Sequence, residues 1–288
     1  MTSRFKQPDN EPFINMSESV HFSFQRTPMI GNPPVSLFDS HVHLDALEFD
    51  IDRGRVLQAA RTAGVGHMLI PAVTAAGWPA LHALCASEPG LYPAYGLHPC
   101  YLDRHFDEQD LAALDAWLGT HPAAAVGECG LDGTAPDHDR QVRLLRRHFE
   151  IARRFDLPLV LHARRAFEAM ILELRRFGIP LRGVVHSFSG SAEQAHQLWK
   201  LGFCVGIGGP VTHDRARRLR KVVASLPAES LLLETDAPDQ PGARRKGQRN
   251  EPAFLVEVLH CVAELRGEDP EALARSTTAN ARRLFRLG

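Results

Sequence analysis

The chain has 288 residues, of which 44% are hydrophobic, enough to bury a sizeable core in one large domain or two small ones. The 33 Lys and Arg residues nearly balance the 34 Asp and Glu residues, so the overall charge does not favour nucleic acid and any basic patch is local. No apolar run reaches the roughly 18 residues that a membrane span needs, so we expect no membrane partner.

Residues 1–35 are polar, rich in Pro and Asn, and without sustained periodicity. This predicts a flexible extension ahead of one domain over residues 36–288, although Met16 or Met29 as the true start, or an unknown targeting role, stays open. The first residues lack the apolar segment of a signal peptide, and the five scattered cysteines form no C-x-x-C pair. We therefore expect reduced thiols and a cytoplasmic protein, with no protein partner evident.

From Ser36 onward, short apolar segments with strand character alternate with amphipathic segments with helical character. Eight such units over about 250 residues predict an α/β fold, a single-domain (β/α)8 TIM-type barrel. An open doubly wound sheet is the alternative, but that fold usually has a Gly-rich turn after its first strand. The strands are predicted over residues 36–43, 66–73, 91–99, 124–132, 158–164, 183–189, 203–210 and 231–238. Helices are predicted over 138–156, 191–202, 251–265 and 269–286.

The first predicted strand ends in "FDSHVHLD", which places His41 and His43 two residues apart. Side chains alternate along a strand, so we expect the two imidazoles on one face. There they either grip a metal ion or are two unrelated polar residues.

The ends of later strands carry further polar residues, and in a barrel all these ends converge at one mouth. One histidine at a strand end is more often a polar residue than a ligand, but a whole set of such residues indicates a metal site. Imidazoles and carboxylates suit Zn, Mn, Fe or Co, with Mg possible, and six ligands suit two divalent ions that share a carboxylate. The six candidates are His41, His43, Glu128, His162, His186 and Asp236.

The segments "FDSHVHLD", "GLHP", "VGECGLD", "LPLVLHAR", "VVHSFSG", "LLLETDAP" and "RNEP" occur in order over about residues 36–287. Together they resemble the TatD family of metal-dependent deoxyribonucleases, within the amidohydrolase superfamily. The resemblance implies that His41 and His43 bind one metal, with Asp236 beside it. It implies that His162 and His186 bind the second metal, and that Glu128 bridges the two.

Two such ions lower the pKa of a bound water and hold a phosphate oxygen. We expect Asp236 to accept the proton of that water, which makes Asp236 and Glu128 catalytic candidates. His98 is a third candidate, either as a hydrogen-bond or proton donor to the phosphate, or as a residue that orients a metal ligand.

A cationic loop, "PDQPGARRKGQRNEP", follows Asp236 directly. Its cations suit a phosphodiester backbone, although a solvated mobile loop is the alternative. Arg164 follows His162 closely enough to reach a phosphate. The expected substrate-binding residues are Arg164, Arg244, Arg245, Lys246 and Arg249.

The leading hypothesis is a hydrolase that cleaves phosphodiester bonds in DNA, exonucleolytic by family resemblance. The basic loop favours this function and the neutral net charge does not. One alternative is an amidohydrolase-type hydrolase of a small ester, lactone, amide or phosphoester. A second is a metal-holding interaction protein, against which Glu128 and Asp236 argue because pure binding needs no activated water.

Overall fold

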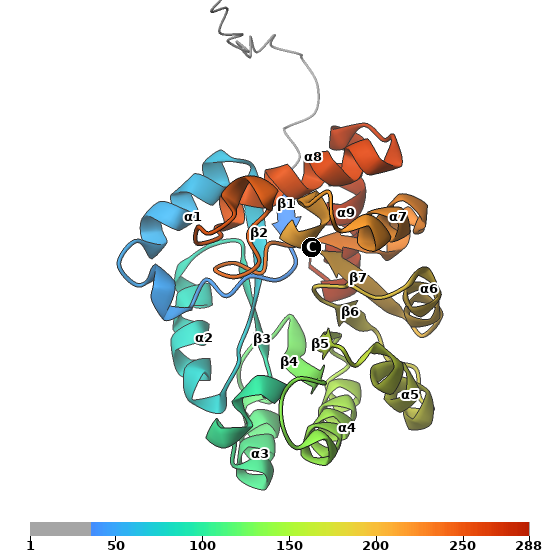
Figure 1. Cartoon of the computed structure of the whole chain (residues 1–288). Helices are drawn as coiled ribbons and strands as arrows, with labels where there is room; N and C mark the ends of the chain where they lie inside the picture. The colour runs from blue at the N-terminus through green and yellow to red at the C-terminus, as the bar shows by residue number, and fades with distance from the viewer. Residues whose placement is uncertain (1–35, 288) are drawn as a thin grey trace, which may run out of the picture. The chain divides into compact units, whose positions relative to one another are not determined.

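The computed structural model describes residues 36–287, and its eight strands form one parallel sheet in which each strand pairs with the next along the chain (Figure 1). The extension expected over residues 1–35 lies outside the described residues. The strands are β1 (Leu37–Asp39), β2 (Val65–Pro71), β3 (Leu91–Tyr95), β4 (Ala125–Asp132), β5 (Leu159–Arg164), β6 (Gly183–Val185), β7 (Phe203–Ile207) and β8 (Leu231–Leu233).

Hydrogen bonds between the ends of β8 and β1 bring the last strand back to the first. The Ser40 amide donates to the carbonyl of Leu233 at 2.9 Å, and the Asp236 amide donates to the carbonyl of His41 at 2.9 Å. The predicted (β/α)8 barrel is confirmed, and the doubly wound alternative is wrong. All eight predicted strands are present, most of them shorter than expected because the chain leaves the sheet before the polar residues at their ends.

Helices surround the strands (Figure 1). α6 begins at the expected capping box, in which Ser191 Oγ accepts from the Gln194 amide at 3.2 Å and Gln194 Oε1 accepts from the Ser191 amide at 2.8 Å. None of the helices in residues 36–287 is long and apolar enough to cross a membrane. The helices are α1 (Arg53–Thr62), α2 (Trp78–Ser87), α3 (Asp107–Leu118), α4 (His138–Arg154), α5 (Phe167–Phe177), α6 (Ala192–Lys200), α7 (Arg217–Ser225), α8 (Leu255–Arg266) and α9 (Pro270–Phe285).

The alternation of side chains along the strands separates two buried layers. Val160, Val184 and Leu232 belong to an apolar cluster inside the barrel that also contains Leu284 and Phe285 of α9. Their neighbours in sequence face the other way and pack under the helices, and Cys129 next to Glu128 does the same. Residues two positions further along the strands therefore share the inner face and lie nearer the carboxyl ends: they are His162, His186 and Glu234.

Candidate metal centre

The six expected ligands all lie at the end of the barrel where the strands have their carboxyl ends, which we call the mouth. Glu128 and His162 lie within β4 and β5, whereas His186 and Asp236 follow the last residues of β6 and β8. His41 and His43 also lie beyond the end of β1, at Asp39, so the expectation that they belong to a strand is wrong. Strand alternation therefore does not orient them, and the loop after β1 does.

The carboxylate of Glu128 lies at the middle of the site and divides it into two halves. Oε2 lies 3.1 Å from Nε2 of His41 and 3.5 Å from Nε2 of His43. Oε1 lies 2.8 Å from Nε2 of His186 and 3.1 Å from Nδ1 of His162. Each carboxylate oxygen thus faces its own pair of imidazole nitrogens from the expected ligands, and Oε1 also faces Nε2 of His98.

In the half around His41 and His43, the two Nε2 atoms lie 3.2 Å apart. Asp236 Oδ1 lies 3.5 Å from the first of these nitrogens and 3.7 Å from the second. The other oxygen of Asp236 accepts a hydrogen bond from Nε2 of Gln240, which fixes the carboxylate plane. Three possible ligand atoms therefore converge beside Glu128 Oε2.

In the other half, Nδ1 of His162 lies 3.2 Å from Nε2 of His186. The far nitrogen of His162, Nε2, lies 3.0 Å from Oδ2 of Asp132. Because a carboxylate only accepts, both ring nitrogens carry protons while Nδ1 faces Glu128 Oε1. Burial opposes the charge, but hydrogen bonds to Cys100, Glu128 and Asp132 raise the pKa of His162 to about 10. A metal ion that replaced the proton on Nδ1 would leave the Nε2 proton on Asp132, which fixes the orientation of the ring. Asp132 is held in turn by Thr134, whose amide and hydroxyl donate to Oδ1 at 2.7 and 2.6 Å.

His98 joins the site as a hydrogen-bond donor. Its Nδ1 accepts from the Cys100 amide at 3.0 Å, so the proton of the neutral ring lies on Nε2. Nε2 lies 3.1 Å from Glu128 Oε1 and donates to it. Burial disfavours the charged ring, but the Glu128 carboxylate favours it and raises the pKa of His98 to about 9. Nε2 carries a proton in both the neutral and the charged ring, so His98 donates to Glu128 in either state.

The electrostatics of the centre fit a bound cation. Burial raises the pKa of Glu128, but the imidazoles of His186, His98 and His41 outweigh this effect and hold that pKa well below its usual range. Burial lowers the pKa of His41 to about 4, so this ring is neutral and its nitrogen can bind metal. Glu128 Oε2 has no hydrogen-bond partner, although it is buried. A divalent ion would supply the missing positive charge.

Three groups of side chains in the described part of the chain have ligand atoms close enough to hold a metal ion. These groups are His41, Glu128 and His186; His41, His43 and Asp236; and His98, Cys100 and His162.

Two buried carboxylates beside the centre were not expected from the sequence. Asp39 accepts from the Thr235 hydroxyl at 2.6 Å and from the His41 amide at 3.2 Å, which joins the ends of β1 and β8. Glu234 Oε1 accepts from the Ser187 amide at 2.5 Å, and burial raises the pKa of Glu234 well above its usual range. Both lie two residues before a ligand candidate, which is the signal that could have indicated them.

The five expected substrate-binding cations divide into two groups. Arg245 pairs with Glu257 at 2.9 Å, and Arg249 pairs with Asp52 at 2.8 Å and with Glu251 at 2.9 Å. These two guanidinium groups are therefore engaged within the protein.

The other three cations are exposed, and two of them, Arg244 and Lys246, have no ion-pair partner within residues 36–287. Arg164 is 65% exposed, with Nη1 4.0 Å from Asp132 Oδ2. The structure thus leaves Arg164, Arg244 and Lys246 available to a ligand.

The barrel and the polar groups at its mouth define a hydrolase of the (β/α)8 class that acts on ester bonds. The chain belongs to the TatD family: residues 38–286 match the family described as TatD related DNase. The family and the barrel expected from the sequence are thereby confirmed.

Curated relatives cover nearly the whole described part of the chain. YjjV of Escherichia coli strain K12, an uncharacterized metal-dependent hydrolase, is 42% identical over 253 residues, which cover 86% of this chain and 97% of the relative. A 3'-5' ssDNA/RNA exonuclease TatD of Erwinia billingiae is 35% identical over 260 residues, which cover 87% of this chain and 99% of the relative. The crystal structure of YjjV superimposes with a TM-score of 0.85 at 39% identity, covering 89% of this chain and 100% of that chain.

Proposed function

We propose that the protein hydrolyses phosphodiester bonds in single-stranded nucleic acid, DNA in particular, from one end of the strand, with two divalent metal ions. The observation that carries this proposal is the division of Glu128, in which each oxygen faces its own pair of imidazole nitrogens. The name of the Erwinia relative, an ssDNA/RNA exonuclease, supports the choice of substrate.

His41, His43 and Asp236 would hold one ion, and His162 and His186 the other, with Glu128 between them. When bound, such ions activate a water and neutralise the charge of a phosphate. Zn, Mn, Co, Fe and Mg all fit a set of imidazoles and carboxylates, so the donor atoms do not select one metal.

The chain's own groups complete the reaction. Asp236 Oδ1 faces the His41 side of the centre and accepts the proton of the attacking water. His98 Nε2–H points into the centre and donates to a phosphate oxygen or to the leaving oxygen. Arg164, Arg244 and Lys246 bind further phosphates through charge.

The test is hydrolysis by metal-reconstituted protein of end-labelled single-stranded DNA, double-stranded DNA and RNA, beside a panel of small esters, lactones and amides. Stepwise release of nucleotides from one end of single-stranded DNA supports the proposal. Turnover of the small esters without any cleavage of nucleic acid would replace it with the small-molecule alternative, which the neutral net charge also allows.

A further inference from the structure

The most exposed apolar side chains of the described residues lie at the mouth. Leu47, Ile51 and Phe106 are 82%, 96% and 71% exposed, and all three lie on loops that follow β1 or β3. The other exposed large apolar residues, Leu172 and Ile179, are less exposed and lie on or after α5. Of the three residues at the mouth, Phe106 lies on the loop that also carries His98 and Tyr101.

The loop between β3 and α3 carries two aromatic rings that the protein holds in place. The Tyr101 ring lies edge-on to the His98 ring, with centroids 5.6 Å apart, and the guanidinium of Arg104 lies 5.4 Å from the Tyr101 centroid. His105 Nε2 donates to the His98 carbonyl at 2.9 Å, and the Phe106 amide donates to Asp110 Oδ2 at 2.9 Å. The backbone that carries the Phe106 ring is thus held by α3, and the residue before it is held by the His98 carbonyl.

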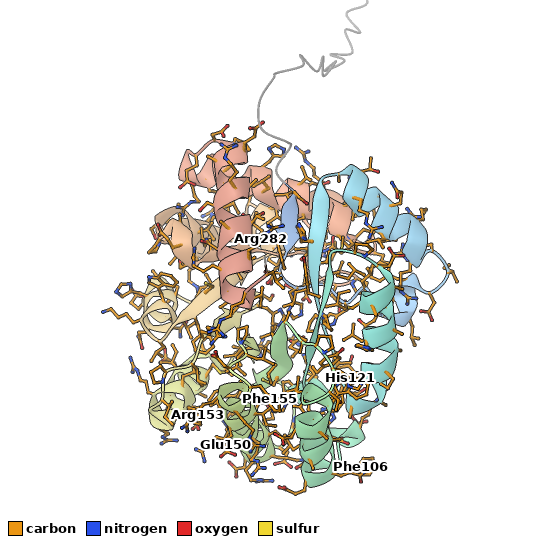
Figure 2. The ribbon with its side chains drawn as sticks, turned by 180° about the vertical axis from the view of Figure 1, so that it is seen from behind. Phe106, His121, Glu150, Arg153, Phe155 and Arg282 are labelled. Carbon is orange, nitrogen blue, oxygen red and sulfur yellow. The ribbon has the colours of Figure 1, made fainter. Side chains whose placement is uncertain are left out.

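Phe106 lies at the outer edge of the molecule, beside the start of α3 (Figure 2). Tyr101 lies next to His98, so this loop carries one ring beside the centre and one exposed ring at the edge. Aromatic rings on such a loop suit bases of a single strand, because every base has a π face to stack.

A cation lies beside the same loop. Cys100, next to Tyr101, places Sγ 3.2 Å from Oδ2 of Asp132, and Arg164 places Nη1 4.0 Å from the same oxygen. The exposed guanidinium of Arg164 therefore adjoins the aromatic loop where that loop meets the metal ligand His162. Exposed aromatic rings beside a phosphate-binding cation are the groups that a single-stranded polynucleotide requires, whereas a purely apolar partner would leave the cation unpaired.

We infer that Tyr101 and Phe106 are base-stacking residues that, with Arg164, form a nucleotide-binding track leading into the centre. This inference rests on the proposed function and deepens it, because it names bases as well as phosphates as the groups recognised.

The experiment measures binding of the full chain to two labelled phosphorothioate strands of about ten nucleotides, one of thymidylate and one abasic, by fluorescence anisotropy. Wild-type protein should bind the thymidylate strand at least about fivefold more tightly than the abasic strand, the scale of one stacked base. Phe106→Ala and Tyr101→Leu should each reduce this ratio, and Phe106→Trp and Tyr101→Phe should retain it.

Charge and apolar controls separate stacking from other effects. Arg164→Gln should weaken the binding of both strands alike and leave the ratio of their affinities unchanged. Arg153→Gln, on the last turn of α4 at the other end of the barrel, should change neither the affinities nor their ratio (Figure 2). Ile179→Ala should also change neither. Equal affinity of wild-type protein for the two strands, or a ratio that survives both ring deletions, overturns the inference.

Hydrolysis measured alongside keeps the two proposals apart. If single-stranded DNA is cleaved but the bases add no affinity, the track fails and the proposed function stands. If the bases add affinity but no strand is cleaved, the proposed function fails and the track stands. Turnover of a small chromogenic phosphodiester should be unchanged in Arg153→Gln, the control outside the track.

Discussion

His162 Nε2 lies 3.0 Å from Asp132 Oδ2, and this contact decides which nitrogen of His162 faces the metal centre. We expect Asp132→Asn to weaken metal binding in the His162 half by about 10- to 100-fold, because an amide no longer fixes the ring's tautomer and orientation. The measurement is metal content after dialysis against graded chelator, together with rate as a function of metal concentration.

The control for this change is Thr134→Val, which removes one hydroxyl donor at 2.6 Å but leaves the carboxylate on His162. Its metal affinity should fall less than that of Asp132→Asn. Unchanged affinity in Asp132→Asn would mean that packing alone orients His162.

Asp236→Asn tests the proton acceptor. The change keeps the size of the side chain, and Asn tolerates the positive φ of 57° at this position. Turnover should fall roughly 10²-fold or more, with substrate affinity little changed, because the amide cannot accept the water's proton. Full activity with metal bound would exclude Asp236 as the base and make His98 the next candidate.

Glu128→Gln should act on metal content rather than on rate alone. The neutral amide cannot offer an oxygen to both halves of the site, so at least one equivalent of metal should be lost. Metal analysis of the purified variant checks this, and retention of the full metal content would contradict the bridging role.

The cations at the mouth should differ in their effect on salt dependence. The combined change of Arg164, Arg244 and Lys246 to Gln should flatten the dependence of DNA affinity on salt by about 0.7 for each lost phosphate contact. Arg245→Gln and Arg249→Gln should hardly change that slope, because these residues pair with Glu257 and Asp52. Arg249→Gln should instead lower the free energy of unfolding by about 1 kcal/mol. A flatter salt dependence of DNA affinity in Arg245→Gln or Arg249→Gln would show that these residues contact phosphate.

A buried histidine away from the centre should make stability depend on pH. His148 Nε2 accepts from the Leu97 amide at 3.1 Å, Nδ1 donates to the Leu144 carbonyl at 2.7 Å, and burial lowers the pKa of His148 to about 4 from 6.5. Between these two values the unfolded chain binds a proton that the folded chain does not, so the free energy of unfolding falls as the pH falls through this window.

The loss of unfolding free energy that His148 causes should reach up to about 3 kcal/mol near pH 4 and be absent above about pH 7. Denaturant unfolding of wild type and His148→Gln at several pH values checks it, since the variant should be less stable at neutral pH but lose less on acidification. Equal losses in the two proteins would show that other groups control the acid response.

The sequence by itself determined the barrel, because eight apolar segments alternate with amphipathic ones and a parallel sheet buries both faces of every strand. It also indicated the six candidate ligands, because imidazoles and carboxylates recur at the ends of several apolar strands, and these ends meet at one mouth of a barrel. The tautomer of His98 could not be predicted, because it depends on the Cys100 amide, which only the turn after β3 brings close.

Tertiary structure alone decided which cations are free. The sequence does not distinguish the four cations of the loop, which are Arg244, Arg245, Lys246 and Arg249. In the folded chain, Asp52, just before α1, pairs with Arg249, and Glu257 of α8 pairs with Arg245. The division of Glu128 between two pairs of imidazoles likewise depends on loops and strands that are distant in the chain. Local patterns specify elements and their buried faces, whereas charge pairing and ligand geometry arise from contacts that form only when the barrel closes.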